Sequence, residues 1–175
     1  MENSSKGIEE SSPDQSSPPR PNYIKRVARR LALFPFIVIA GLYLLSMTAP
    51  EPNNLGATGG QLAKCPDSPN CVSTQADDET HRMEAIPFAG NSDELLAKIK
   101  SLIESEFGRA KLITESEGYL RYEFKSLIFR FIDDVEFLVD HEASVIHFRS
   151  ASRVGHSDMG KNRKRMQKIA ERLKQ

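Results

Sequence analysis

The stretch from Arg149 to Met166, RSASRVGHSDMGKNRKRM, places hydroxyl side chains, glycines and cations where an apolar run gives way to a predicted helix. Hydroxyls and free backbone N–H groups at a helix start can hold an anion, and arginines add charge. The candidate residues for such an anion-binding site are Arg149, Ser152, Arg153, Ser157 and Arg163. The alternative is a structural loop in which Asp158 caps the helix. The glycine spacing matches no nucleotide-binding fingerprint.

Three residues elsewhere are candidates to support that site: His81, Asp133 and Asp134. The two aspartates are adjacent on a predicted strand, so they face opposite sides and do not form a paired-carboxylate acid–base site. Asp133 falls among the apolar residues of its strand, where a carboxylate needs a partner. The candidate partners are Arg149, Arg153 and Arg163. We favour a structural Asp–Arg pair over the alternative, in which Asp133 or His81 is a general base beside a bound anionic substrate.

Cys65 and Cys71 are the only cysteines, and two prolines lie between them. In an oxidising compartment such a pair forms a disulfide that closes a small loop. Redox-active thiols are less favoured because the spacing is not C-x-x-C. A metal site would need two further ligands, which the scattered histidines do not supply. We therefore predict a structural disulfide, no metal and no cofactor.

The elements that position these residues follow a long apolar segment. No residue from 31 to 49 is charged, and about 19 helical residues span roughly 28 Å, close to the hydrocarbon core of a bilayer. The basic residues just before it are Lys25, Arg26, Arg29 and Arg30. The positive-inside rule then predicts a cytoplasmic N-terminus and an extracytoplasmic, periplasmic-side domain. The alternatives are a cleaved signal peptide, which usually has a shorter N-terminal part, and a buried soluble helix.

These features predict four regions. Residues 1–22 form a disordered cytoplasmic tail, 23–49 a basic flank and transmembrane signal anchor, 50–61 a Gly/Asn/Pro linker, and 62–175 the extracytoplasmic domain. The body of that domain is acidic and residues 150–175 are basic. This asymmetry fits either a basic helix packed near an acidic body or a basic surface that faces an anionic partner such as lipid head groups.

Hydrophobic periodicity predicts the elements of the domain. We expect strands over 82–88, 110–116, 119–126, 129–140 and 145–151, with 62–82 an ordered loop at most. A helix capped by Ser92 should run from 91 to 107, and a second should begin near 157 or 158. The fold class is α+β: a mostly antiparallel sheet of about five strands with two helices packed on one face, after an N-terminal transmembrane helix.

Three segments together carry a family resemblance. They are CPDSPNCVS (65–73), RFIDDVEF (130–137) and the stretch that begins at Arg149, in this order after a membrane segment. The chain resembles domain-of-unknown-function family 1499 over roughly residues 62–175. The resemblance implies a compact, envelope- or plastid-associated domain with no established activity, and it carries over no catalytic residue.

The sequence thus favours a membrane-anchored, non-catalytic domain that binds an anionic envelope ligand, such as an anionic lipid or a phosphate compound, or a protein partner. One alternative is a small hydrolase or transferase that uses His81 and Asp133 on an anionic substrate, but no nucleophile motif, metal-ligand set or cofactor loop supports it. Another is a purely structural envelope module. Nucleic acid is not an expected partner, because few aromatic residues stand near the basic segment and the compartment does not fit.

Overall fold

The computed structural model describes residues 23–174. The predicted disordered tail, residues 1–22, lies outside the described residues. The chain divides into two units, one up to Val38 and one from Ile39 onward. Helix α1 (Tyr23–Thr48) runs across this boundary and includes the basic flank, so Pro35 lies inside it. By length and composition, its stretch Lys25–Thr48 is apolar enough to cross a membrane.

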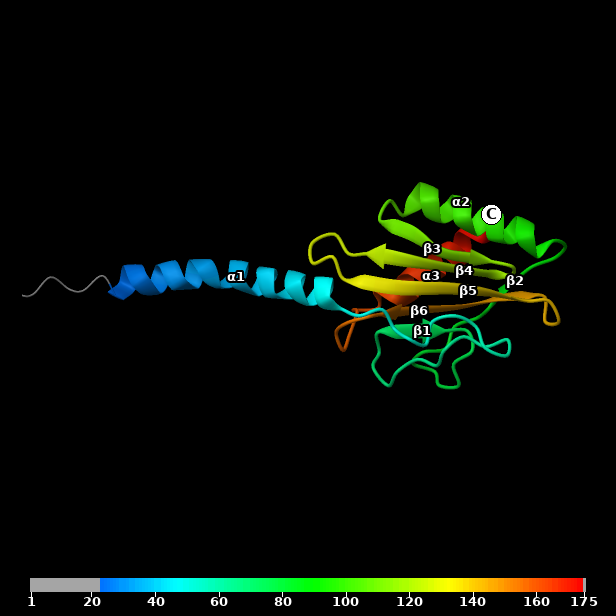
Figure 1. Ribbon diagram of the computed structural model, residues 1–175, viewed down its shortest axis with the longest axis horizontal. Coiled ribbons are helices and arrows are strands. Elements are labelled where there is room, and N and C mark those ends of the chain that lie inside the picture. The colour runs from blue at the N-terminus through cyan, green and yellow to red at the C-terminus, as the bar shows by residue number, and fades with distance from the viewer. Residues whose placement is uncertain (1–22, 175) are drawn as a thin grey trace, which may run out of the picture. The chain divides into compact units, whose positions relative to one another are not determined.

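The second unit is built on one antiparallel sheet of six strands (Figure 1). Its strand order is β1-β6-β5-β4-β3, and β2 also pairs with β6. The elements are β1 (Cys71–Ser73), β2 (Ile86–Pro87), α2 (Ser92–Glu106), β3 (Ala110–Ser116), β4 (Tyr119–Lys125), β5 (Ile132–Asp140), β6 (Val145–Ser152) and α3 (Lys161–Leu173). The predicted α+β class is confirmed, with one strand more than expected.

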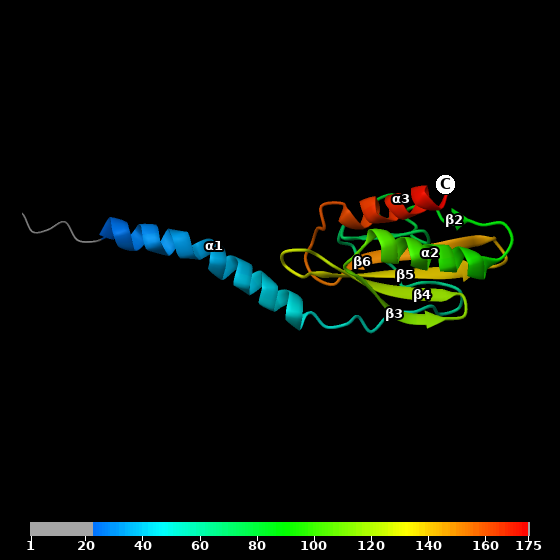
Figure 2. The same ribbon diagram turned by 90° about the horizontal axis from the view of Figure 1, so that it is seen from above.

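One face of the sheet forms the hydrophobic core with α2 and α3 (Figure 2). Alternation along β4 directs Leu120, Tyr122 and Phe124 toward the helices, and the neighbouring strands do the same. The fully buried side chains of the helices include Ile99 and Ile103 from α2 and Met166 and Ile169 from α3. Burying apolar surface of this kind contributes about 25 cal/mol per Å², which makes this face the main source of stability.

The segment before β2 is more ordered than its composition indicates. We expected 62–82 to be a loop at most, but Cys71–Ser73 is strand β1, with Cys71 paired to Ala151 of β6. All three residues are buried. The prediction was wrong because three residues give no readable period: the strand forms by pairing with a distant edge, which is a tertiary effect. Conversely, the strand expected over 82–88 shrinks to Ile86–Pro87.

The two helix starts also differ from the prediction. The α2 cap is Asn91, whose side chain accepts a hydrogen bond from the Asp93 backbone N–H at 2.8 Å. Helix α3 begins only at Lys161, because Met159 and Gly160 adopt left-handed backbone conformations, with φ of 57° and 72°. These conformations turn the chain once more before the helix can begin.

Cys65 and Cys71 form the predicted disulfide. It ties an irregular segment to β1, and hence to the sheet, across six positions of sequence. A closed loop of this size stabilises the folded state by about 2 kcal/mol in the chain-entropy model, because it restricts the unfolded chain.

We therefore expect Cys65→Ser to lower the free energy of unfolding by about 2 kcal/mol relative to the oxidised wild type. Urea titration of the full chain in detergent, followed by tyrosine fluorescence, measures this difference. Dithiothreitol should lower the urea midpoint of the wild type and leave that of Cys65→Ser unchanged. A wild-type midpoint that does not respond to reduction would contradict the prediction.

Candidate functional site

A polar cluster lies between the start of α3 and the sheet. Asp133 accepts hydrogen bonds from Arg165 Nη2 and from the Ser152 hydroxyl, both at 2.5 Å. The Arg165 guanidinium also lies 4.5 Å above the ring of Phe124. Asp133 therefore has the charged partner and the hydroxyl donor that a carboxylate on an inner sheet face requires.

The predicted structural Asp–Arg pair is thus present, but its arginine was named wrongly. We expected Arg149, Arg153 or Arg163, and the structure supplies Arg165. The reason lies in the geometry of β6 and α3. Residues 149 and 153 point to the other face of the sheet, whereas Arg165 stands one helical turn into α3 and over Asp133.

Asn162 is the centre of this cluster and is 1% exposed. Its Oδ1 accepts hydrogen bonds from the Ser150 hydroxyl and from Arg165 Nη1, both at 2.6 Å. Its Nδ2 donates to the Asn70 carbonyl at 2.9 Å and to the Ser152 hydroxyl at 3.1 Å. The amide is fully satisfied, so Asn162 has no free donor or acceptor for a ligand.

The loop before α3 is held by its own side chains. The Ser157 hydroxyl accepts a hydrogen bond from the Met159 N–H at 3.3 Å. Asp158 accepts from the N–H groups of Gly160 and Asn162, at 2.9 and 2.6 Å. The capping role that we considered for Asp158 is thereby fulfilled, and Asp158 occupies two of the N–H groups that an anion would use.

His81 and Arg163 hold the loop that precedes β2. Arg163 donates to the carbonyls of Thr80 and Arg82, at 2.6 and 3.0 Å. The His81 ring is buried, with Nδ1 at 2.8 Å from Asp78 and Nε2 at 3.1 Å from the Ser68 carbonyl. Both ring nitrogens face acceptors, which favours the doubly protonated imidazolium. Desolvation opposes that charge, but the bonds to Asp78 and Ser68 outweigh it and raise the pKa of His81.

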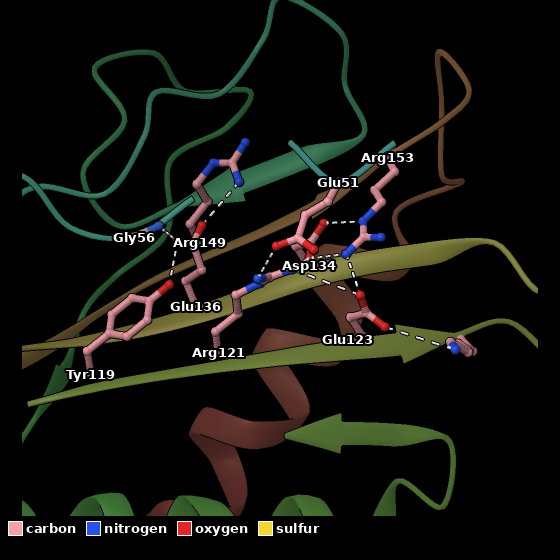
Figure 3. Close-up of polar contacts among 10 residues, drawn as sticks. Glu51, Gly56, Tyr119, Arg121, Glu123, Asp134, Glu136, Arg149 and Arg153 are labelled. Atoms are coloured by element: carbon pink, nitrogen blue, oxygen red, sulfur yellow. Dashed lines mark hydrogen bonds and ion pairs between the residues drawn. The ribbon is translucent and has the colours of Figure 1, made fainter. Parts of the chain in front are cut away.

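The opposite face of the sheet carries a buried ionic network (Figure 3). Asp134 is 1% exposed and accepts from Arg121 Nη2 at 3.0 Å and from Arg153 Nε at 2.7 Å. Arg153 also donates to Glu123, and Arg121 donates to Glu51, both at 2.5 Å. The hydrogen bonds to Asp134 raise the pKa of Arg153. Glu51 comes from the segment expected to be a linker, so this segment lies against the sheet.

Glu136 is the most deeply buried carboxylate of this network, with no exposed surface. Its Oε1 accepts from the Tyr119 hydroxyl at 2.8 Å and from the Gly56 N–H at 2.7 Å. Its Oε2 lies 3.3 Å from Arg149 Nη1. Burial and the adjacent Glu136 charge raise the pKa of Tyr119, so its hydroxyl stays a donor at neutral pH.

Among the described residues, Arg149 is the guanidinium of the network that has a buried donor atom without a partner. It is 5% exposed, yet within the described chain its Nε has no hydrogen-bond partner and only Nη1 has one. It borders a cavity of about 290 Å³. The other polar residues that line this cavity are Asn54, Lys64, Asp134, Ser152 and Arg153. A buried donor without a partner beside an open space marks the candidate binding site of this domain.

The structure therefore splits the predicted anion-binding residues. Arg149, Arg153 and Asp134 come together on the ionic face, as strand alternation requires. The other predicted residues lie in the α3 cluster, in the loop before α3, or against the loop that precedes β2: Ser152, Asp133, Ser157, Arg163 and His81.

The sequence analysis did not predict the following residues of the ionic face: Glu51, Tyr119, Arg121, Glu123 and Glu136. The signal that could have identified the charged strand residues among them is the sign of the charges at positions that pair across neighbouring strands. Arg121 lies opposite Glu136, and Glu136 lies opposite Arg149, so unlike charges face one another across three strands. Over residues 23–174, no His, Cys, Asp and Glu side chains form a group that could hold a metal ion.

Fold and site together define a class of protein: an antiparallel α+β sheet domain with a buried ionic face, preceded by one apolar helix. The chain belongs to the family described as a protein of unknown function (DUF1499), whose model matches residues 61–173. This match confirms the predicted family and nearly the predicted extent. No curated protein and no solved structure matches the chain.

The Asp133–Arg165 pair generates a first prediction. Asp133→Asn keeps the shape and leaves the half-buried guanidinium without a counter-charge, so we expect the free energy of unfolding to fall by about 3 kcal/mol. Glu115→Gln is the matched control, because its pair with Lys100 is exposed and should contribute less than about 1 kcal/mol. Equal urea midpoints for the two variants would contradict the structural role of Asp133.

The His81–Asp78 pair generates a second prediction. Because the folded-state pKa of His81 is raised, its stabilisation is complete below about pH 6.5 and is lost as pH rises through the folded pKa. The hydrogen bond from His81 lowers the pKa of Asp78, so the same contact weakens at acid pH as that carboxylate is protonated. Melting temperatures measured in steps from about pH 5 to about pH 9 should therefore differ between wild type and His81→Gln at the acid end and converge at the alkaline end.

The exposed His141 provides the control for this measurement. His141→Gln should follow the wild-type profile at every pH. A constant difference between wild type and His81→Gln across the range would show that packing, and not protonation, holds the loop.

Proposed function

We propose that this protein is a membrane-anchored domain that binds a small anion, a carboxylate or a phosphate group, at Arg149. The observation that carries the proposal is the unpartnered Nε of this buried arginine beside the cavity. Nε and Nη2 form one edge of the planar guanidinium, and neither has a partner among the described residues. Such an edge is the fork that binds carboxylate or phosphate through two parallel hydrogen bonds.

The surroundings of the cavity support an anion more than a neutral ligand. Lys64 is exposed at its rim, and Arg149 and Arg153 line it. The carboxylates nearby already have donors: Asp134 binds two arginines, and Glu136 accepts from Tyr119 and Gly56. An anion on the Nε–Nη2 edge leaves the 3.3 Å contact between Nη1 and Glu136 in place, and the charge of Glu136 then opposes its binding.

Three features support the anchored, extracytoplasmic location. Helix α1 is long and apolar enough to span a bilayer. Four basic residues precede its uncharged part, which by the positive-inside rule places the N-terminus in the cytoplasm. The Cys65–Cys71 disulfide fits an oxidising compartment on the other side. A signal sequence passes the same length test, so the anchor is part of the proposal.

The hydrolase alternative has no support from the geometry. His81 binds Asp78 and Ser68, and Asp133 binds Arg165 and Ser152, so each proposed base is used by a structural contact. The two residues belong to separate clusters and do not border the Arg149 cavity. We therefore assign the domain a binding role.

The test compares melting temperatures of the full chain in detergent with and without phosphate, acetate and a phosphate monoester. A ligand at 100 times its Kd adds about 2.7 kcal/mol to stability. Glu136→Gln removes the competing charge and should bind the anion more tightly than the wild type. The double variant Arg149→Met with Glu136→Gln leaves no unpaired charge and should lose the response.

Arg82→Gln removes an exposed cation away from the cavity and serves as the control, with a wild-type response expected. The same anion response in wild type, Glu136→Gln and the double variant would refute the assignment, because the ions would then act elsewhere. A complete absence of response to all three ligands in Glu136→Gln would refute it too.

A further inference from the structure

The loop between β4 and β5 presents large apolar side chains to solvent. Leu127 is 68% and Ile128 65% exposed. The loop is not loose, since the Ser126 N–H donates to the Phe131 carbonyl and the Phe131 N–H donates to the Ser126 hydroxyl, each at 2.9 Å. The Phe129 and Phe131 rings of the same loop pack with their centroids 5.6 Å apart. Two adjacent, large apolar side chains that a fixed loop holds in solvent are a candidate contact surface.

Cations surround this tip. A groove of about 540 Å³ begins at Leu127 and is lined by Arg109, Lys125 and Lys161, among others. Its two acidic side chains, Glu106 and Asp133, are already paired with basic residues of α3. Arg109 and Lys161, and also Arg130 on the loop itself, have no carboxylate partner in the part of the chain that the structure describes. The surface thus combines two exposed apolar side chains with three cations that lack a carboxylate partner among the described residues.

The chain joins the domain close to this surface. Helix α1 ends at Thr48, and Glu51 is bound to Arg121 of β4. The three residues that lead from Thr48 to Glu51 span at most about 11 Å when extended. In both Figure 1 and Figure 2, the segment that follows α1 reaches the sheet at the end where the β4–β5 loop and the loop between β6 and α3 lie.

We propose that the β4–β5 loop contacts the phospholipid bilayer that α1 spans: Leu127 and Ile128 insert among the upper acyl chains, and the cations meet the lipid phosphates. This inference rests on the membrane anchor of the proposed function and is independent of its anion site. Apolar side chains at the boundary with Lys and Arg at headgroup level are the pattern by which proteins lie on a membrane surface. The short tether holds the domain where the loop can reach the lipid.

The chain has no tryptophan, so a single one can report the environment of the tip. Leu127→Trp and Ile128→Trp replace exposed side chains and should fold as the wild type does. Each full-length variant is reconstituted into vesicles that contain an anionic phospholipid, and its emission is recorded with and without bromine-labelled acyl chains. His141→Trp, in the exposed turn before β6, is the matched control.

We expect emission at shorter wavelength, and quenching by brominated chains, for Leu127→Trp and Ile128→Trp, and water-like, unquenched emission for His141→Trp. Identical water-like emission for all three variants would overturn the proposal. Flotation of the same vesicles separates this result from a failure of the anchor. Protein that floats with the lipid but shows water-like emission refutes the loop contact alone, whereas protein that stays at the bottom refutes the anchor.

Discussion

The structure depends on one constraint: charges buried on a sheet face must be paired within the protein. Asp134 and Glu136 are shielded from solvent almost completely, and an unpaired carboxylate there would cost several kcal/mol. Strand alternation makes this constraint unavoidable, because it directs the apolar residues of β4, β5 and β6 to the helices and the charged ones to the other face. The carboxylates on that face are satisfied by three arginines, by Tyr119 and by the chain that precedes β1. The position of the segment around Glu51 and Gly56 follows from this need.

The same reasoning explains why the start of α3 resembles a ligand site. Hydroxyls, glycines and arginines near a helix start serve an anion and a structural network equally well, since both need donors in a small space. Here Asn162 and Arg165 come from within the helix and occupy the hydroxyls of Ser150 and Ser152. The network fixes how α3 lies on the sheet, and the partly unsatisfied donor is found on the other face, at Arg149.

The features that could be predicted from the sequence are those that local sequence patterns determine. The long strands, the two helices of the domain and the opposite orientation of Asp133 and Asp134 all follow from periodicity, and the disulfide follows from the two cysteines. Strand β1 could not be predicted, because it exists only through pairing with β6. The partner of Asp133 could not be chosen either, since the register of α3 against the sheet is a packing outcome. The role of Glu51 depends on a contact across 70 positions, which no local pattern contains.

The bond between Glu51 and Arg121 also sets how mechanical load reaches the domain. Tension along the chain from α1 first meets this carboxylate–guanidinium pair on β4, in the interior of the sheet, before it reaches the edge strand β1. Residues 65–71 cannot lengthen under that tension, because the disulfide closes them into a ring. Rupture of the ionic contacts would free the segment from 51 to 59, while Gly60 and Leu62 stay bonded to Gln75 and the core between the sheet and the helices stays folded.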